Sequence, residues 1–133
     1  MSSVVVDTDV VSYVFKSHPF GSRYDTDLAG HVALISFMTV AEIERWVLQH
    51  RWGNQRVQLL RTFLQRFTVV PSSPDLCRKW AEVMVGARAA GRRVESTDAW
   101  IAATALLHGA PLLTNNRRDY LGVSGLILIS HAP

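Results

Sequence analysis

The sequence predicts an α/β fold with three layers, α/β/α, around a central parallel sheet of about five strands. Short apolar runs alternate with longer stretches of helical periodicity along the whole chain. Strands that alternate with helices form βαβ units, in which the strands run parallel and helices cover both faces. The chain has 133 residues and no repeat, linker or low-complexity tract. We therefore expect one domain over residues 1–133.

Five short apolar segments are the predicted strands. The first, Val4-Val5-Val6, is β-branched throughout, which is typical of a strand buried on both faces. The third is stopped by Pro71, which cannot continue a sheet ladder. The predicted strands are residues 4–6, 32–37, 67–70, 112–113 and 126–129.

Helical signals fill the segments between these strands in the first half of the chain. A short helix is expected over about residues 8–16 and closes near Pro19. Thr39 is expected to open the next helix, whose apolar residues recur at helical spacing. Gly53 breaks that helix, and another begins near Gln55.

Two further helices are predicted in the second half. Ser73 followed by Pro74 and an acid is a strong helix start, and Gly91 ends that helix. Residues 99–107 are apolar nearly all round, which indicates a helix packed on more than one side. Gly109 is its expected C-terminal stop.

The composition excludes several classes of protein. An apolar fraction of 48% and a charged fraction of 19% indicate a folded chain and not a disordered one. No apolar run approaches the roughly 20 residues needed to cross a membrane. The single cysteine, Cys77, allows no internal disulfide and fits a reducing cytoplasm. The five histidines are scattered without ligand spacing, so no zinc site is predicted.

The net charge is +3, and arginine supplies most of the cations. Only Lys16 and Lys79 among the fourteen Lys and Arg residues are lysine. The planar guanidinium suits phosphate, which favours a nucleic-acid partner. A compositional bias toward arginine explains the same excess, and the count alone does not separate the two interpretations.

Polar side chains gather at one edge of the predicted sheet. Asp7 follows the first strand, and Asn116 and Asp119 follow the fourth. Glu42 and Asp98 lie in the first turns of helices that are expected to begin at that same edge. Crowded carboxylates need a cation between them, and oxygen ligands select Mg²⁺ or Mn²⁺. A bound divalent ion generates hydroxide at neutral pH.

Each of these residues also has a purely structural interpretation. Thr39 and Glu42 fit a capping box, so Glu42 could serve only the helix end. Asp98 could complement a helix dipole, and Asp119 could be a turn residue. Asp9 is interpreted as the cap of the first helix and not as a ligand.

Four segments in order resemble the PIN-domain nucleases, and within them the VapC toxins of bacterial toxin–antitoxin pairs. They are VVVDTDVV, MTVAEIERW, ESTDAWIAATAL and LLTNNRRDY. The resemblance implies that Asp7, Glu42 and Asp98 form the acidic triad, with Asn116 and Asp119 at the fourth position after Thr114. It implies Mg²⁺- or Mn²⁺-dependent cleavage of RNA, often tRNA or rRNA, a homodimer, and a small antitoxin whose tail covers the active site.

The chain departs from the family pattern at two positions. Asp9 stands where many relatives carry asparagine, which adds a negative charge beside the site. Asn116 stands where an acid is common, so Asp119 either supplies that charge or the second metal site is weak.

Two rival functions fit part of the pattern. The opening segment also fits haloacid-dehalogenase-like phosphatases, with Asp7 as nucleophile and Asp9 as acid/base. That chemistry needs a late lysine, and no lysine follows Lys79. The other rival is a PIN-fold binding module without catalysis, which has no physical reason to keep repelling acids together.

Arginines flank the predicted site on two loops and are the expected RNA contacts. Arg92 and Arg93 precede Asp98, and Arg117 and Arg118 lie between Asn116 and Asp119. The arginines on helices are interpreted as a solvated face; they are Arg56, Arg61 and Arg66.

Overall fold

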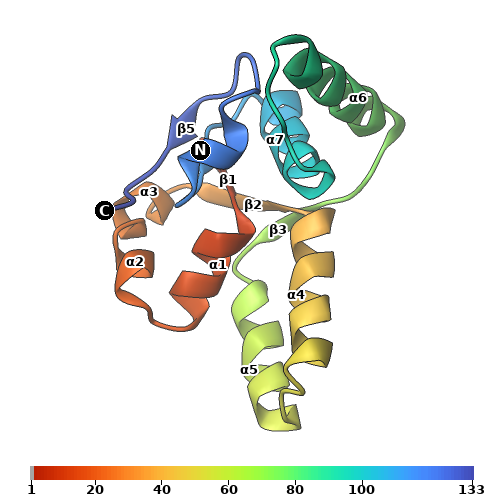
Figure 1. The fold of residues 1–133 in the computed structure, drawn as a ribbon. Helices are drawn as coiled ribbons and strands as arrows, with labels where there is room; N and C mark the ends of the chain where they lie inside the picture. The colour runs from red at the N-terminus through yellow and green to blue at the C-terminus, as the bar shows by residue number, and fades with distance from the viewer. Residues whose placement is uncertain (1) are drawn as a thin grey trace.

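The computed structural model describes residues 2–133, which form a five-stranded sheet covered by helices (Figure 1). The strands are β1 (Ser3–Val6), β2 (Val32–Ser36), β3 (Thr68–Val70), β4 (Leu112–Leu113) and β5 (Leu128–Ile129). They pair in the order β3-β2-β1-β4-β5, and every pairing is parallel. The chain leaves β1 toward β2 and later returns to its other side as β4. The strand order therefore reverses beside β1, which is where ligands bind in such sheets.

One face of the sheet is covered by helices from the first half of the chain. These are α1 (Thr8–Phe15), α4 (Phe37–Gln49) and α5 (Asn54–Leu64). Val4 and Val6 of β1 point to this face and pack in one apolar cluster with Val10, Ile43 and Phe63. In Figure 1, α4 and α5 run side by side and project away from the sheet as a pair.

The opposite face is covered by α7 (Ser96–His108). Val5, between the two valines just named, joins Ile101 and Ala102 of this helix in a second cluster. The helix α6 (Pro74–Ala89) forms the outer wall, because its Leu76 and Val83 pack on α7 and not on the sheet. The predicted three-layer α/β/α architecture with five parallel strands is confirmed.

Several predicted helix ends are also confirmed. The side chain of Ser73 accepts a hydrogen bond from Leu76 N at 3.1 Å and caps α6. Gly109 ends α7 with a left-handed backbone, φ 60°, that other residues adopt only with strain. A 3-10 helix, η1 (Arg117–Tyr120), follows β4 and had no counterpart in the prediction.

Two local predictions were wrong. The helix α4 begins at Phe37, capped by Ser36, and Thr39 lies buried inside it. Asp7, and not Asp9, is the N-cap of α1. The segment after α1, for which no element was predicted, contains two short helices, α2 (Pro19–Ser22) and α3 (Asp25–Leu28). Within residues 2–133, no helix combines the length and apolar character that crossing a bilayer requires.

Candidate active site

Asp7 lies at the carboxyl end of β1, beside the point where the strand order reverses. Only 6% of the residue is exposed. Its Oδ1 accepts a hydrogen bond from Thr8 N at 2.7 Å. Its Oδ2 accepts one from Thr114 Oγ1 at 2.8 Å and one from the Tyr120 hydroxyl at 2.9 Å. Burial raises the pKa of Asp7 to about 6 in spite of these donors, so a positive charge beside it would stabilise the ionised carboxylate.

Glu42 reaches the same place from the second turn of α4. The Thr8 hydroxyl donates to Glu42 Oε1 at 2.8 Å, and the hydroxyls of Thr8 and Thr39 are 2.9 Å apart. The capping-box interpretation of Glu42 is wrong, because Ser36 caps this helix. Glu42 lies near enough to Asp7 and Asp98 for its charge to raise the pKa of each.

Asp98 occupies the first turn of α7, as predicted. The Tyr120 hydroxyl lies 3.5 Å from its Oδ1 and so links it to Asp7. The pKa of Asp98 is raised to about 7. Partial burial is the largest cause, and the charge of Asp7 is the next. Asp98 therefore shares one patch of negative potential with Asp7 and Glu42.

Asp9 also faces this patch and is not a helix cap. Its Oδ1 accepts from Val10 N at 2.7 Å, and its Oδ2 accepts from Asn115 N at 3.1 Å, so it ties α1 to the loop after β4. Burial raises the pKa of Asp9 to about 7, with the charge of Asp7 as the next cause.

The two candidates for the fourth position bond to each other. Asn116 Nδ2 donates to Asp119 Oδ2 at 2.9 Å across the first turn of η1. Asn116 is exposed, whereas Asp119 is half-buried and its charge raises the pKa of Asp9 and Asp98. Burial in turn raises the pKa of Asp119. The negative charge at this position comes from Asp119, with the Asn116 amide as its partner.

The two arginine pairs lie on adjoining segments. A Cβ added to Gly122, just after η1, would come within 2.5 Å of Arg92 Cβ, so the loop before α7 packs against that segment. Arg93 forms an exposed ion pair with Glu95 at 3.1 Å, while Arg117 and Arg118 are exposed at the start of η1.

The helical arginines have partners of other kinds. Arg61 pairs with Glu44 at 2.6 Å, and the Arg56 guanidinium lies 4.0 Å from the centre of the Trp52 ring. These side chains belong to the surface of the α4–α5 pair.

The donor set at this edge fits a hard divalent cation. None of its five carboxylates forms an ion pair within residues 2–133; they are Asp7, Asp9, Glu42, Asp98 and Asp119. In that part of the chain no three acidic, His or Cys side chains converge tightly enough to enclose a metal by themselves. Mg²⁺ is commonly held by one or two carboxylates and keeps several waters, which matches a loose group of this kind.

Sequence reasoning missed three hydroxyls that organise the acids. Thr8 serves Glu42, and Tyr120 joins Asp7 to Asp98. Tyr24, which is fully buried, donates to Asn115 Oδ1 at 2.8 Å and supports the loop after β4. The only available signal was local, because Thr8 and Tyr120 are the immediate neighbours of Asp7 and Asp119.

Comparison with known proteins shows the family to which the chain belongs. Residues 4–122 match the family model described as PIN domain. Ribonuclease VapC4 of Mycobacterium tuberculosis is 33% identical over 82% of this chain and 85% of its own length. The crystal structure of VapBC2 from Rickettsia felis, bound to a promoter DNA fragment, contains a chain that superposes with a TM-score of 0.84 at 22% identity, covering 96% of this chain and 97% of that one. VapBC-5 of M. tuberculosis gives 0.75 at 26% identity, covering 98% and 99%. The chain belongs to the PIN domain family, and within it to the VapC ribonucleases of toxin–antitoxin systems.

Proposed function

We propose that this VapC-family hydrolase is an endoribonuclease that cleaves tRNA or rRNA with Mg²⁺ or Mn²⁺ held by Asp7, Asp98 and Glu42. VapC nucleases are a metal-dependent family. The observation that carries the proposal is the group of acids without ion pairs, within residues 2–133, at the switch point of the sheet, where neighbouring negative charges help to raise the pKa of Asp7 and Asp98. Membership of the ribonuclease family also leaves the phosphatase alternative without support.

The residues of the chain divide the work. When bound, the divalent ion supplies a hydroxide at neutral pH and offsets the charge of the phosphodiester. Asp7, Asp98 and Glu42 are the proposed ligands, and Glu42 reaches the site from α4. Asp119 with Asn116 completes the fourth position. Residues 1–133 act as one catalytic domain in the cytoplasm.

RNA reaches this edge along the two arginine loops. Arg92 and Arg93 lie on the loop that leads to α7, and Arg117 and Arg118 open η1 immediately before Asp119. All four side chains are exposed, so their guanidinium groups are open to phosphate. The ion pair between Arg93 and Glu95 is exposed as well, and such pairs contribute too little to prevent this.

A purified-protein assay tests this function. Wild type is incubated with tRNA and with rRNA in EDTA, in Mg²⁺ and in Mn²⁺, and Asp7→Asn serves as the matched inactive variant. We expect site-specific fragments only with metal and only from wild type. Equal cleavage in EDTA contradicts the metal dependence. A lack of Mn²⁺ binding and of cleavage together supports the alternative of an inactive binding module.

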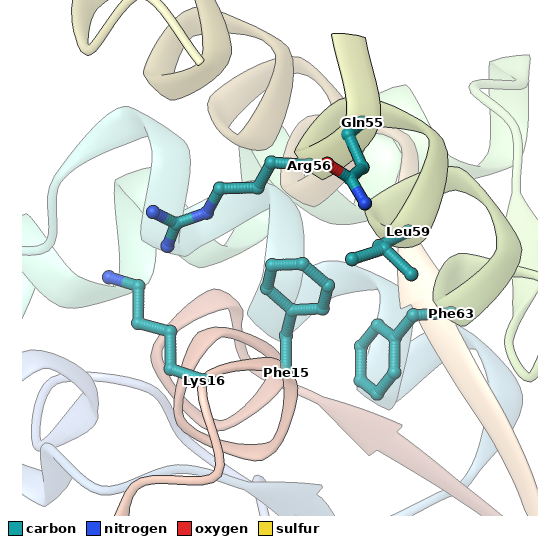
Figure 2. Close-up of a pocket in the computed structure, with 6 residues that line it drawn as sticks. All are labelled: Phe15, Lys16, Gln55, Arg56, Leu59 and Phe63. Carbon is teal, nitrogen blue, oxygen red and sulfur yellow. The ribbon is translucent and has the colours of Figure 1, made fainter. Parts of the chain in front are cut away.

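We further propose that a small antitoxin binds beside the site, over the groove between α1 and α5 (Figure 2). Phe15, Leu59 and Phe63 form an apolar lining to a hollow of about 610 Å³, and Lys16 and Arg56 stand at its rim. Leu59 is 61% exposed and shares this hollow with two phenylalanines, so apolar surface is open to a partner there. This lining suits a segment that presents apolar and acidic side chains together.

The groove lies within reach of the acids. It sits at the last turn of α1, whose N-cap is Asp7, and the eight residues of this helix span only about 12 Å. One antitoxin tail can therefore occupy the groove and cover the site. The protein encoded by a short neighbouring reading frame is the candidate partner. Leu59→Glu is expected to abolish co-purification with it, whereas Leu48→Glu, at an exposed leucine outside the groove lining, is the control.

Homodimerisation is the remaining part of this proposal. Exposed apolar side chains outside the groove offer a surface for a second copy; they are Val85, Leu107, Leu121 and Ile127. The molar mass in solution, measured by light scattering, distinguishes a dimer from a monomer of 14.8 kDa.

A further inference from the structure

Tyr120 places a buried hydroxyl between two of the acids. The residue ends η1, and only 1% of it is exposed. Its hydroxyl lies 2.9 Å from Asp7 Oδ2 and 3.5 Å from Asp98 Oδ1. These carboxylates belong to different elements, the end of β1 and the start of α7, so the hydroxyl connects the sheet to the helix layer.

Asp98 depends on this contact more than Asp7 does. Asp7 has two further donors, Thr8 N and Thr114 Oγ1. Within residues 2–133, no side chain other than Tyr120 lies within hydrogen-bond distance of Asp98. A hydroxyl carries one hydrogen, so Tyr120 donates mainly to Asp7 at the shorter distance and shares that hydrogen with Asp98.

The other buried tyrosine shows what a structural hydroxyl does in this fold. Tyr24 donates to the carbonyl of Thr114 at 3.1 Å and to the Asn115 side chain at 2.8 Å, and it touches none of the acids. Within residues 2–133 the Tyr120 hydroxyl bonds to no backbone group, and both of its partners are carboxylates. The Tyr120 hydroxyl therefore contacts the acids of the site, whereas the Tyr24 hydroxyl supports a loop.

We propose that Tyr120 is a positioning residue that fixes the relative orientation of Asp7 and Asp98, so that together they bind the divalent cation. This inference rests on the proposed function, since it concerns the same metal site. Two carboxylates held by a shared donor lose less conformational freedom when they bind an ion. Residues that hydrogen-bond to metal ligands without touching the metal typically contribute 10–100-fold to metal affinity or activity.

Tyr120 does not act as a general base in this scheme. Burial raises the pKa of Tyr120 far above the ordinary value for a phenol, and the charges of Asp7 and Asp98 raise it further. The hydroxyl is therefore protonated at neutral pH and is a hydrogen-bond donor there.

The test compares Tyr120→Phe with Thr104→Val in the full chain. Both variants remove one buried hydroxyl and keep the volume of the side chain. Thr104 lies in α7, like Asp98, but its hydroxyl bonds only to the carbonyl of Trp100. Mn²⁺ affinity is measured by calorimetry, and thermal unfolding without metal is measured in parallel to confirm that both variants fold.

Tyr120→Phe is expected to bind Mn²⁺ about tenfold more weakly than wild type, whereas Thr104→Val binds it unchanged. Raising Mn²⁺ is expected to restore most of the cleavage rate of Tyr120→Phe, because its ligands remain and only their positioning is lost. Equal Mn²⁺ affinity in wild type and Tyr120→Phe overturns the inference and leaves the proposed function standing. A wild-type protein that binds no Mn²⁺ overturns both.

Discussion

The Thr8 hydroxyl donates a hydrogen bond to Glu42 Oε1 at 2.8 Å, although the two residues are 34 positions apart in the chain. Thr8 follows Asp7 directly, so this bond holds the Glu42 carboxylate against the acid that ends β1. Thr39 stands behind Thr8 at 2.9 Å and completes a chain of two hydroxyls. Because Thr8 gives its hydrogen to Glu42, Thr39 is the donor to Thr8. Glu42 is thus oriented toward the site and not toward the end of its own helix.

This arrangement predicts the behaviour of Glu42→Gln. The amide oxygen can still accept from Thr8, so the side chain keeps its position while losing its charge. We expect a melting temperature at or above that of wild type, because repulsion among the acids falls. We expect RNA cleavage to fall about 100-fold or more, since even outer partners of a metal contribute 10–100-fold.

Glu44→Gln is the matched control for this experiment. It lies on the same helix, but its carboxylate pairs with Arg61 at the surface, and such exposed pairs contribute little to stability. Its cleavage rate should equal that of wild type. If Glu42→Gln remains active and melts at a lower temperature, Glu42 has a structural role only.

Asp98→Asn tests the ligand on the other side of the site. The volume is unchanged, and asparagine is tolerated in the first turn of a helix, so the fold should persist. We expect the Mn²⁺-dependent cleavage of RNA to be abolished and Mn²⁺ affinity to fall more than in Tyr120→Phe. A purified variant that cuts RNA as fast as wild type shows that Asp98 is not a ligand.

The buried acids also predict an unusual dependence of stability on pH in the absence of metal. Burial raises the pKa of Asp7 to about 6 and those of Asp9 and Asp98 to about 7, against about 4 in an unfolded chain. The folded state therefore binds more protons than the unfolded state between these values. The free energy of unfolding should fall as pH rises from about 4 to about 7.

Urea unfolding in EDTA at several pH values measures this effect. Asp98→Asn lacks one of the three groups, so its stability should fall less over the same interval. Added Mn²⁺ should oppose the fall in wild type, because it binds the ionised acids and favours the folded state by mass action. A wild-type stability that rises steadily from pH 4 to pH 7 in EDTA, with Asp98→Asn following it in parallel, contradicts this prediction.

The sequence predicted the elements whose signals are local and strong. The β-branched run at Val4–Val6 and the helix start at Ser73 were both confirmed, because burial on two faces and a side-chain cap leave direct marks in the sequence. The convergence of Asp7, Asp98 and Asp119 also followed from topology, since parallel strands bring their carboxyl ends to one edge.

Other features depend on contacts that no local pattern reveals. Ser36 lies in an apolar strand pattern, so the sequence favours Thr39 as the start of α4. In the structure the Ser36 side chain accepts a hydrogen bond from Met38 N and caps the helix. The short helices α2 and α3 form around the buried Tyr24, whose hydroxyl bonds to residues 90 positions away. The conformation of this segment follows from the tertiary contacts of Tyr24 and not from local helix propensity.

The last prediction concerns the path of RNA across the surface. Contacts to phosphate supply much of nucleic-acid affinity and make it fall with salt concentration. Replacing Arg117 and Arg118 with alanine should weaken RNA binding and reduce its salt dependence by about one unit of slope per lost contact. Mn²⁺ affinity should stay close to that of wild type, because neither side chain is a ligand. Binding is measured in EDTA at several salt concentrations, so that cleavage does not intervene.

The double replacement of Arg56 and Arg61 is the control. Both pairs remove two positive charges, but Arg56 and Arg61 lie on α5, where Arg56 stacks on Trp52 and Arg61 pairs with Glu44. Because long-range attraction is the same in the two variants, any difference in slope reports direct contact with phosphate. A larger loss of affinity from the α5 pair than from the η1 pair places the RNA across the α4–α5 helices. The proposed entry along the loops beside Asp98 and Asp119 would then be wrong.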